Sequence, residues 1–379
     1  MSDAASSVAP DSVNPTKWIA LLGRRDEPTD GVEDYCLFLG RALASQGIEL
    51  EQVRVPWGEL GWIGALRRLS RESSAWRGKW VLLQYTTFMW SRRGFPLGVV
   101  VAMAIVRLCG ARVAIVFHEA SRQGGPRWID RLRGACQDGV IRKLHRGAVK
   151  SIFTVPLETV AWLPRGEDKA AHISIGANVP ECVNRRAVPA LARERKTVIV
   201  FGVTGAPEMA REVERIVEVM LEASKELGKM RLVAVGRGSV EAKELFGEAF
   251  EGSNVEVVVR GILPAVEIAR EFESADVMLF VRGAITPQRG SAIAGIACGV
   301  PIVGYWNGEI GGPLMEAGIE WSSQPDRDSL TRGLVRVLSD LNRWTELHER
   351  NLEAQKNCFS WATIAEQFCR VLQGRGADI

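Results

Sequence analysis

The chain has 379 residues, which is too long for one ordinary hydrophobic core, so its length predicts two domains. Hydrophobic residues make up 46% of the sequence and charged residues 25%, which is typical of a soluble, globular protein. The net charge of +3 is too small to indicate a nucleic-acid-binding protein by itself.

The first half of the chain alternates between apolar runs and helical patterns. Residues 17–22 form a short apolar run typical of a buried parallel strand, and a polar loop, a helix over 32–47 and a strand over 48–55 follow. Asp30 and Gly31 stand where that helix begins. Further strands are predicted at 80–85, 112–118, 151–155 and 172–175, and helices at 96–108 and 126–146. Such repeats predict a parallel sheet covered by helices on both faces.

A segment without periodicity, residues 179–196, separates this half from a second α/β series. It is rich in Pro, Arg and Asn, so we interpret it as an inter-domain linker. The strands predicted after it are 197–201, 231–235, 255–260, 277–281 and 301–305, and the helices lie around 213–221, 265–274, 327–341 and 344–372. A cleft between two such domains suits a reaction of two substrates, because ligands bind at the carboxyl ends of parallel strands.

The stretch from Ala284 to Tyr305 combines a polar turn, a short helix of small residues and an apolar strand. The helix is predicted to begin at Gly290, where Ser291 can satisfy free backbone N–H groups. The positive end of the helix dipole and the neighbouring Arg289 make this turn a candidate phosphate site. An ordinary capped helix between two buried strands is the alternative interpretation.

The histidines differ in their sequence contexts. His118 directly follows an apolar strand pattern, so we expect it at the carboxyl end of a strand, where ligands bind. His145 and His348 lie in charged helical patterns and are expected at the surface, whereas His172 begins a predicted strand and is expected to be structural.

The seven cysteines are scattered, with no C-x-x-C pair and no histidine at ligand spacing. The sequence therefore predicts neither a disulfide framework nor a metal site, and it fits a reducing cytoplasm. Residues 1–16 lack a basic segment followed by an apolar one, so a disordered leader is expected rather than a signal peptide. The apolar run 95–109 is shorter than the roughly 18 to 20 residues that span a bilayer, so we expect a buried helix.

Basic residues are dense between Arg67 and Lys150, and they are interleaved with tryptophans, namely Trp76, Trp80, Trp90 and Trp128. One interpretation is a rim that meets anionic lipid or a lipid-linked acceptor, since Trp, Lys and Arg suit a membrane interface. The other is core aromatics surrounded by solubilising charge. Both stay open at the level of the sequence.

Several motifs, in this order and spacing from Trp18 to about Leu372, resemble the GT-B glycosyltransferases, in particular the retaining family 4. The motifs are DGVEDYCLFLGRALASQGIELEQV, VAIVFHE, HISIGANVP, VIVFGVTG, and SADVMLF followed by RGSAIAGIACGVPIVGY. The resemblance implies two Rossmann-like parallel α/β domains that face a central cleft. It implies an acceptor-side domain over 17–178, a nucleotide-sugar domain over 197–355, and a C-terminal helix within 356–379 that crosses back to the first domain.

The resemblance also implies a cytoplasmic enzyme that transfers a sugar from a nucleotide-diphosphate sugar to a glycan, a lipid-linked acceptor or a small molecule, with retention and without a metal or other cofactor. In such an enzyme His118 would orient the donor sugar, and the loop at Gly31 would border the acceptor. Negative charge grows on the leaving diphosphate and must be stabilised. The residues expected to bind it are Arg289, Gly290, Ser291, Gly205, and Arg211 or Arg215.

One feature departs from family 4, whose members commonly carry two glutamates eight positions apart around this helix. The corresponding positions here are Thr286 and Ala294, and neither can act as a carboxylate. Two other functions therefore stay open. One is a catalytically silent GT-B protein that is a binding subunit of another transferase, and the other is a GT-B-type epimerase that acts on the sugar nucleotide itself.

Overall fold

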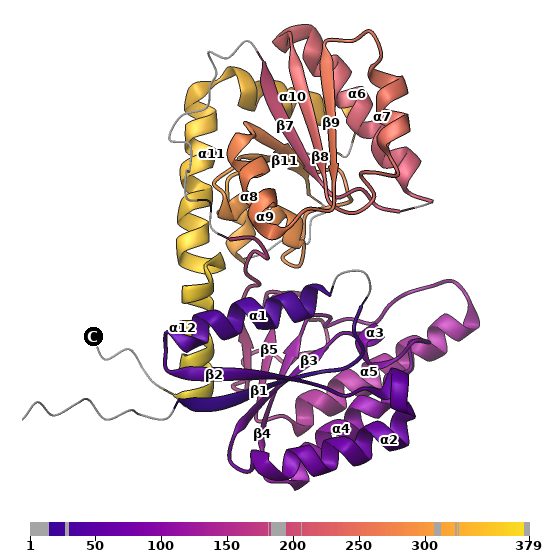
Figure 1. Cartoon of the computed structure of the whole chain (residues 1–379), viewed down its shortest axis with the longest axis vertical. Coiled ribbons are helices and arrows are strands. Elements are labelled where there is room, and N and C mark those ends of the chain that lie inside the picture. Colours follow the sequence, from indigo (N-terminus) through magenta and orange to yellow (C-terminus); the bar gives the residue numbers. More distant parts are fainter. Residues whose placement is uncertain are drawn as a thin grey trace, which may run out of the picture.

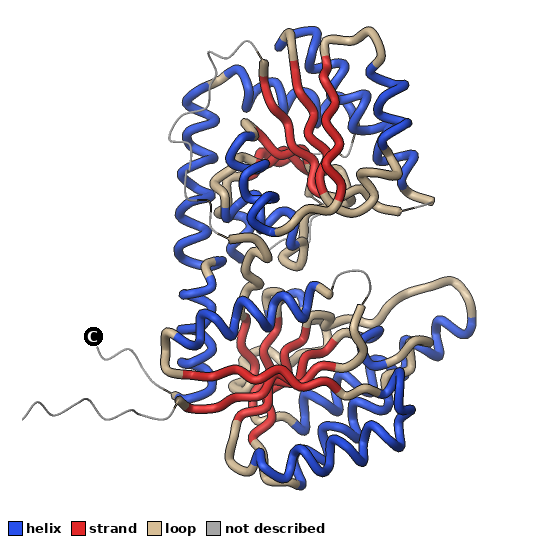
Figure 2. Tube along the Cα trace, in the orientation of Figure 1, coloured by secondary structure: helices blue, strands red, loops and turns tan. Residues whose placement is uncertain are grey.

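The computed structural model describes residues 15–26, 30–180, 182, 195–205, 207–306, 312–322, 324 and 326–374. They form two α/β units, each built around a six-stranded parallel sheet with helices on its faces (Figure 1). The strands of each sheet lie inside the helical layers (Figure 2). The predicted class, two Rossmann-like parallel α/β units, is confirmed.

The sheet of the first unit has the strand order β2-β1-β3-β4-β5-β6. The strands are β1 (Thr16–Leu22), β2 (Ile48–Arg54), β3 (Trp80–Tyr85), β4 (Arg112–Phe117), β5 (Lys150–Phe153) and β6 (Ala170–His172). Every residue of β3 is buried, as expected for a central strand covered on both faces. The strand order reverses beside β1, where β3 is its neighbour on the side opposite β2.

The helices of the first unit are α1 (Gly31–Ala44), α2 (Trp57–Glu72), α3 (Thr87–Trp90), α4 (Leu97–Leu108) and α5 (Trp128–Gly147), with 3₁₀ turns at Ser73–Trp76 and Leu157–Thr159. Helix α2, which contains three glycines, was not predicted from the sequence. Gly61 has φ of 65° and interrupts the helical backbone, so no regular helical pattern marks this segment.

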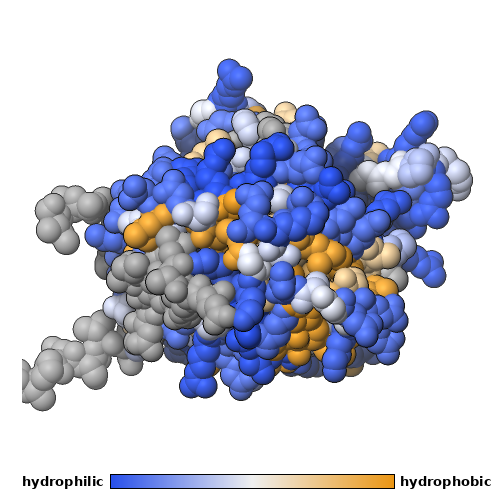
Figure 3. Space-filling model, turned by 90° about the horizontal axis from the view of Figure 1, so that it is seen from above, coloured by the Kyte–Doolittle hydropathy of each residue, from blue (hydrophilic) through white to orange (hydrophobic). Residues whose placement is uncertain are grey.

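The sheet of the second unit has the order β12-β11-β10-β7-β8-β9. Its strands are β7 (Lys196–Phe201), β8 (Met230–Val235), β9 (Val255–Gly261), β10 (Val277–Leu279), β11 (Ile302–Tyr305) and β12 (Ile319–Ser322). Its helices are α6 (Met209–Leu227), α7 (Lys243–Phe250), α8 (Ala265–Ser274), α9 (Gly290–Ala297), α10 (Arg327–Ser339) and α11 (Leu341–Ala354), with a 3₁₀ turn at Gly312–Met315. Seen from above, the molecule is mainly hydrophilic, with hydrophobic residues in patches between hydrophilic ones (Figure 3).

The end of the chain joins the two units a second time. The helix predicted over 344–372 is divided into α11, a π-helical turn (Gln355–Phe359) and α12 (Trp361–Gln373), whose first turn is capped by Ser360. The ring of Trp361 lies 5.3 Å from that of Tyr35 and stacks on Phe38 at 5.7 Å, both on α1. Phe368 is buried in the core of the first unit. Figure 1 shows α11 and α12 running from the second unit to the first.

Three sequence predictions about buried residues are wrong. His145 and His348 are not at the surface: both are 5% exposed, and they hydrogen-bond to Ser151 Oγ at 2.9 Å and to Gly299 O at 2.6 Å, because each lies on the core side of its helix. The prediction of no disulfide is also wrong, since Cys182 and Cys298 form one. They are 116 residues apart, and only the folded chain brings their Cα atoms to 5.1 Å.

The predicted linker 179–196 and leader 1–16 fall largely outside the described residues, which omit 1–14, 181 and 183–194. Of the four tryptophans between Arg67 and Lys150, three are buried, whereas Trp128 is 75% exposed. The core interpretation therefore holds for Trp76, Trp80 and Trp90, and Trp128 remains a surface residue. In the described part of the chain, no helix has the length and apolar character needed to cross a membrane.

Candidate functional site

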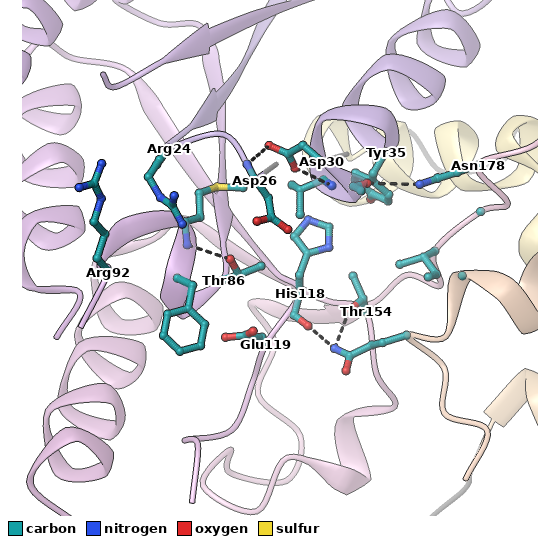
Figure 4. Close-up of a pocket in the computed structure, with 18 residues that line it drawn as sticks. Arg24, Asp26, Asp30, Tyr35, Thr86, Arg92, His118, Glu119, Thr154 and Asn178 are labelled. Carbon is teal, nitrogen blue, oxygen red and sulfur yellow. Dashed lines mark hydrogen bonds between the residues drawn. The ribbon is translucent and has the colours of Figure 1, made fainter. Parts of the chain in front are cut away.

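A cleft of about 720 Å³ opens where the carboxyl ends of the first sheet meet the second unit. Most of its wall comes from the first unit, and Gln288 and Gly290 at the start of α9 contribute the opposite side. Figure 4 shows Arg24 and Arg92 at one end of this cleft and Thr154 and Asn178 at the other, with Asp26, His118 and Glu119 between them.

Asp30 shapes the loop between β1 and α1. Its Oδ1 accepts from the backbone N–H groups of Val32 and Glu33, both at 3.1 Å, and so caps α1. Its Oδ2 accepts from Asp26 N at 3.3 Å and from Arg54 Nη2 at 3.0 Å. A carboxylate that is almost fully buried thus fixes both the helix start and the course of the loop that borders the cleft.

Gly31, the first residue of α1, lines the cleft. A Cβ at this position would meet no atom within 4 Å, so the backbone here faces open space. Its carbonyl accepts from Asn178 Nδ2 at 3.4 Å. A ligand in the cleft can therefore approach this stretch of backbone closely.

His118 directly follows β4 and lines the cleft. Its Nε2 lies 2.8 Å from Gln84 Oε1. The amide of Gln84 is oriented by donation from its Nε2 to Leu82 O at 3.2 Å, so Gln84 presents its oxygen to the histidine. Nε2 of His118 must then carry the proton, which leaves Nδ1 as a hydrogen-bond acceptor.

Burial lowers the pKa of His118 from 6.5 to about 4, and the charge of Asp30 opposes this shift. The imidazole is therefore neutral near pH 7. The ring of Tyr35 meets it edge-on with a centroid separation of 4.9 Å and limits its rotation. A neutral, oriented imidazole can accept a hydrogen bond from a substrate hydroxyl without adding charge to the cleft.

Gln288 connects the two sides of the cleft. Its Nε2 donates to the backbone carbonyl of His118 and, at 3.2 Å, to Thr154 Oγ1. Helix α9 then begins at Gly290 as predicted, but Arg289 is the N-cap residue and no side chain caps the helix. The expectation that Ser291 caps α9 is wrong, because the helix begins one residue before it and Arg289 already occupies the cap position.

Arg282 follows β10 along the chain and lies near two other arginines, Arg289 and Arg237. It packs against Gly202, where a Cβ would lie 2.5 Å from its Nη1. Burial is the main cause that lowers its pKa, Glu212 opposes the shift, and the charges of Arg289 and Arg237 lower the pKa further. Neighbouring guanidinium groups that repel one another form a site that favours an anion.

Arg215 on α6 belongs to the same group. Burial raises the pKa of the Tyr305 hydroxyl at the end of β11, whereas the charges of Arg215 and Arg289 lower it. A Cβ at Gly283 would lie 3.7 Å from Arg289 Nη2 and 3.9 Å from the Tyr305 hydroxyl, so these groups surround one space. We refer to Arg215, Arg237, Arg282 and Arg289 as the arginine cluster.

The remaining residues considered in the sequence analysis are not part of this cluster. Gly205 is exposed in the loop after β7, and Arg211 is exposed and pairs with Glu208 at 3.5 Å. The positions of the two family glutamates are filled by Thr286, in the turn before α9, and by Ala294, which is buried in the core. Arg237 and Arg282 were not among the residues predicted from the sequence. Each comes soon after a strand, β8 or β10, so the rule that ligands bind at carboxyl ends could have identified them.

No protein-family model matches this sequence, and no curated protein matches it either. Several solved structures, however, are similar to the structure of this chain. HepE of Anabaena in complex with UDP and glucose superposes with a TM-score of 0.64 at 12% identity, over 95% of this chain and 100% of that one. Sucrose-phosphate synthase from Thermosynechococcus elongatus has a TM-score of 0.65 at 15% identity, over 95% and 99%. A putative UDP-N-acetylglucosamine 2-epimerase from Listeria monocytogenes has a TM-score of 0.61 at 11% identity, over 96% and 98%.

These similarities extend over nearly the whole chain and show that it has the GT-B fold. The fold implied by the sequence motifs is therefore confirmed. At such low identity the similarity shows the fold alone, and it does not single out family 4.

Proposed function

We propose that this protein is a glycosyltransferase that uses a nucleotide-diphosphate sugar, with UDP as the first nucleotide to test. The observation that carries the proposal is the position of the arginine cluster and the uncapped start of α9 beside a cleft that also contains His118. The neighbour structures with UDP or UDP-glucose support this choice of donor.

In the proposed reaction an acceptor hydroxyl attacks the anomeric carbon of the sugar from the face that the diphosphate leaves, and the proton of this hydroxyl passes to the departing phosphate oxygen. Arg282, Arg289 and the N–H groups of Gly290 and Ser291 stabilise the negative charge that grows on the leaving oxygen. His118 Nδ1 accepts a hydrogen bond from a sugar hydroxyl and fixes the orientation of the sugar. We propose retention of anomeric configuration, as the family 4 resemblance implies. NMR analysis of the first-formed product tests this, and an inverted product would contradict it.

A thermal-shift measurement tests nucleotide binding. UDP should raise the melting temperature, because a ligand that binds only the folded state stabilises it by RT ln(1 + [L]/Kd). Arg289→Ala should weaken binding about tenfold or more and reduce this shift, since hydrogen bonds to charged groups contribute about 1.5–3 kcal/mol each. Arg332→Ala, which removes an exposed arginine of α10, is the matched control. An equal UDP shift in the wild type and Arg289→Ala would rule out this role.

A sugar-nucleotide epimerase is the second candidate. It needs acid and base groups in the cleft, and two carboxylates, Asp26 and Glu119, line the cleft near His118 (Figure 4). Products distinguish the candidates: a transferase releases UDP in step with a glycosylated acceptor, whereas an epimerase returns an intact sugar nucleotide of changed configuration. A binding subunit would do neither.

We also propose that the enzyme acts in the cytoplasm and makes peripheral contact with an anionic membrane. Helix α4 packs against α2 and against α5. These three helices expose large hydrophobic side chains in a region rich in arginine. The exposed hydrophobic residues are Leu60, Ile63, Leu97, Val101, Leu108, Trp128 and Leu132. Apolar side chains beside cations suit an anionic lipid surface.

Flotation tests the membrane contact. The full chain should float with vesicles of phosphatidylcholine and phosphatidylglycerol but not with phosphatidylcholine alone, and Ile63→Asp should reduce this binding, because it places a carboxylate at a residue that is 71% exposed. Val266→Asp on α8, at a residue that is 55% exposed, is the control for the added charge. Equal flotation of both variants would contradict the proposed face.

A further inference from the structure

The end of the cleft far from Asn178 contains two arginines from different elements (Figure 4). Arg24 follows β1, and Arg92 follows α3; both line the cleft. Their side chains converge on Gly58, where a Cβ would lie 3.6 Å from Arg24 Cδ and 3.6 Å from Arg92 Nη2. The two side chains are therefore neighbours, although the residues are 68 positions apart in the sequence.

Among the residues that the structure describes, no carboxylate forms an ion pair with either side chain. Nε of Arg24 is buried and has no hydrogen-bond partner. An unpaired buried donor and two adjacent like charges both oppose folding, and an anion between them would relieve both costs. A planar guanidinium donates two parallel hydrogen bonds, which match the oxygens of a phosphate.

The cleft continues beyond Arg92 into a second cavity of about 240 Å³, whose wall shares Phe88 and Arg92 with the first. Arg93 and Arg133 also line this cavity. Nε of Arg133 is a second buried donor without a partner, although its Nη1 pairs with Asp130 at 2.9 Å. Further arginines thus lie beyond Arg24 and Arg92, on the side away from His118.

The carboxylates lie on the inner side of these arginines. Glu119 Oε2 accepts from Thr87 N at 2.8 Å, which fixes the side chain at the start of α3. Asp26 lies between Arg24 and His118 (Figure 4). Carboxylate oxygens only accept hydrogen bonds, so they suit hydroxyl groups. Along the cleft, the arginines at one end are followed by carboxylates that can accept hydrogen bonds from hydroxyl groups. At the other end lies Gln288, on the side proposed for the sugar donor.

We infer that Arg24 and Arg92 bind a phosphate group of the acceptor, whose hydroxyl extends past Asp26 and Glu119 toward the donor sugar. This inference rests on the proposed transferase function and names the acceptor class as a phosphorylated hydroxyl compound. The phosphate belongs to the acceptor and is distinct from the diphosphate of the donor, because it lies at the opposite end of the cleft from Gln288 and Gly290.

The test measures phosphate binding with the donor site filled. In the presence of saturating UDP, inorganic phosphate should raise the melting temperature of the full chain further. In Arg24→Gln/Arg92→Gln the apparent Kd for phosphate should rise at least about tenfold, because both charge-assisted contacts are removed. The single variant Arg332→Gln, with the same charge change per site on α10, should respond like the wild type. No phosphate shift in the wild type, or an equal shift in the double variant, would overturn the inference.

A second measurement distinguishes two sources of the phosphate. Glucose 6-phosphate supplies it on a soluble acceptor, and phosphatidylinositol in phosphatidylcholine vesicles supplies it on a lipid. The measurement is the release of UDP from the sugar donor. If one of the two compounds stimulates this release in the wild type but not in the double variant, that compound identifies the source of the phosphate. Stimulation that persists unchanged in the double variant counts against the site.

Failure of this inference can be separated from failure of the proposed function. The shift that UDP alone produces reports the donor site and the folding of each variant. If UDP produces no shift in the wild type, the proposed donor site for UDP fails, whatever the response to phosphate. If UDP binds normally while the phosphate response is independent of Arg24 and Arg92, only the acceptor inference fails.

Discussion

His118→Ala is expected to lower kcat/KM for sugar transfer about a hundredfold, the effect of a misplaced reacting group. The imidazole is held by Gln84 and bordered by Tyr35, so its orientation beside the cleft is fixed. Its loss should free the sugar to rotate, whereas the arginine cluster, the proposed diphosphate site, stays intact. The release of UDP from the donor measures the rate, and the UDP thermal shift should be preserved.

The pH dependence gives the His118 prediction a second readout. Because burial holds the pKa of His118 near 4, kcat/KM should show no loss through protonation of this residue between pH 8 and about 5.5. In the unfolded chain the pKa is 6.5, so the unfolded state binds the proton first as the pH falls, and the contribution of His118 to stability declines from pH 6.5 to about 4. His118→Ala should flatten this decline.

His172→Ala is the matched control, since His172 is a partly buried histidine at the end of β6 that does not line the cleft. It should change kcat/KM less than about threefold, the effect of well under 1 kcal/mol. A His118→Ala enzyme as active as this control would remove His118 from the mechanism.

Asp30→Ala is expected to lower the free energy of unfolding of the first unit by about 2.5–4 kcal/mol. The substitution removes the cap of α1, which contributes about 1 kcal/mol, and a charge-assisted hydrogen bond from Arg54, which contributes about 1.5–3 kcal/mol. It also releases the loop at Asp26, so acceptor binding should weaken as well. Urea unfolding followed by tryptophan fluorescence measures the effect, because most tryptophans lie in the first unit.

Asp34→Ala, in the same turn of α1, is the control. Burial raises the pKa of Asp34, and the charges of Asp30 and Glu33 raise it further, so its carboxylate is destabilised where it stands. Its removal should leave stability unchanged or slightly higher. If Asp30→Ala costs no more than Asp34→Ala, the buried carboxylate does not organise this loop.

The sequence by itself determined the architecture. Alternation of apolar runs with helical patterns predicted two parallel α/β units, because strands buried on both faces must be apolar throughout. The same reasoning located His118 after β4, Asp30 and Gly31 at the start of α1, and Gly290 at the start of α9, since each follows a strand along the chain. It missed α2, where Gly61 breaks the pattern.

Only the tertiary structure decided which distant residues share a site. Arg24 and Arg92 become neighbours through the pairing of β1 with β3, and Arg282 meets Arg289 and Arg237 because β10, β7 and β8 are adjacent in the second sheet. The pairing of Cys182 with Cys298 and the burial of His145 and His348 have the same origin. Periodicity records whether a side chain faces a core, whereas the identity of its neighbours depends on strand order and on the packing of one unit against the other.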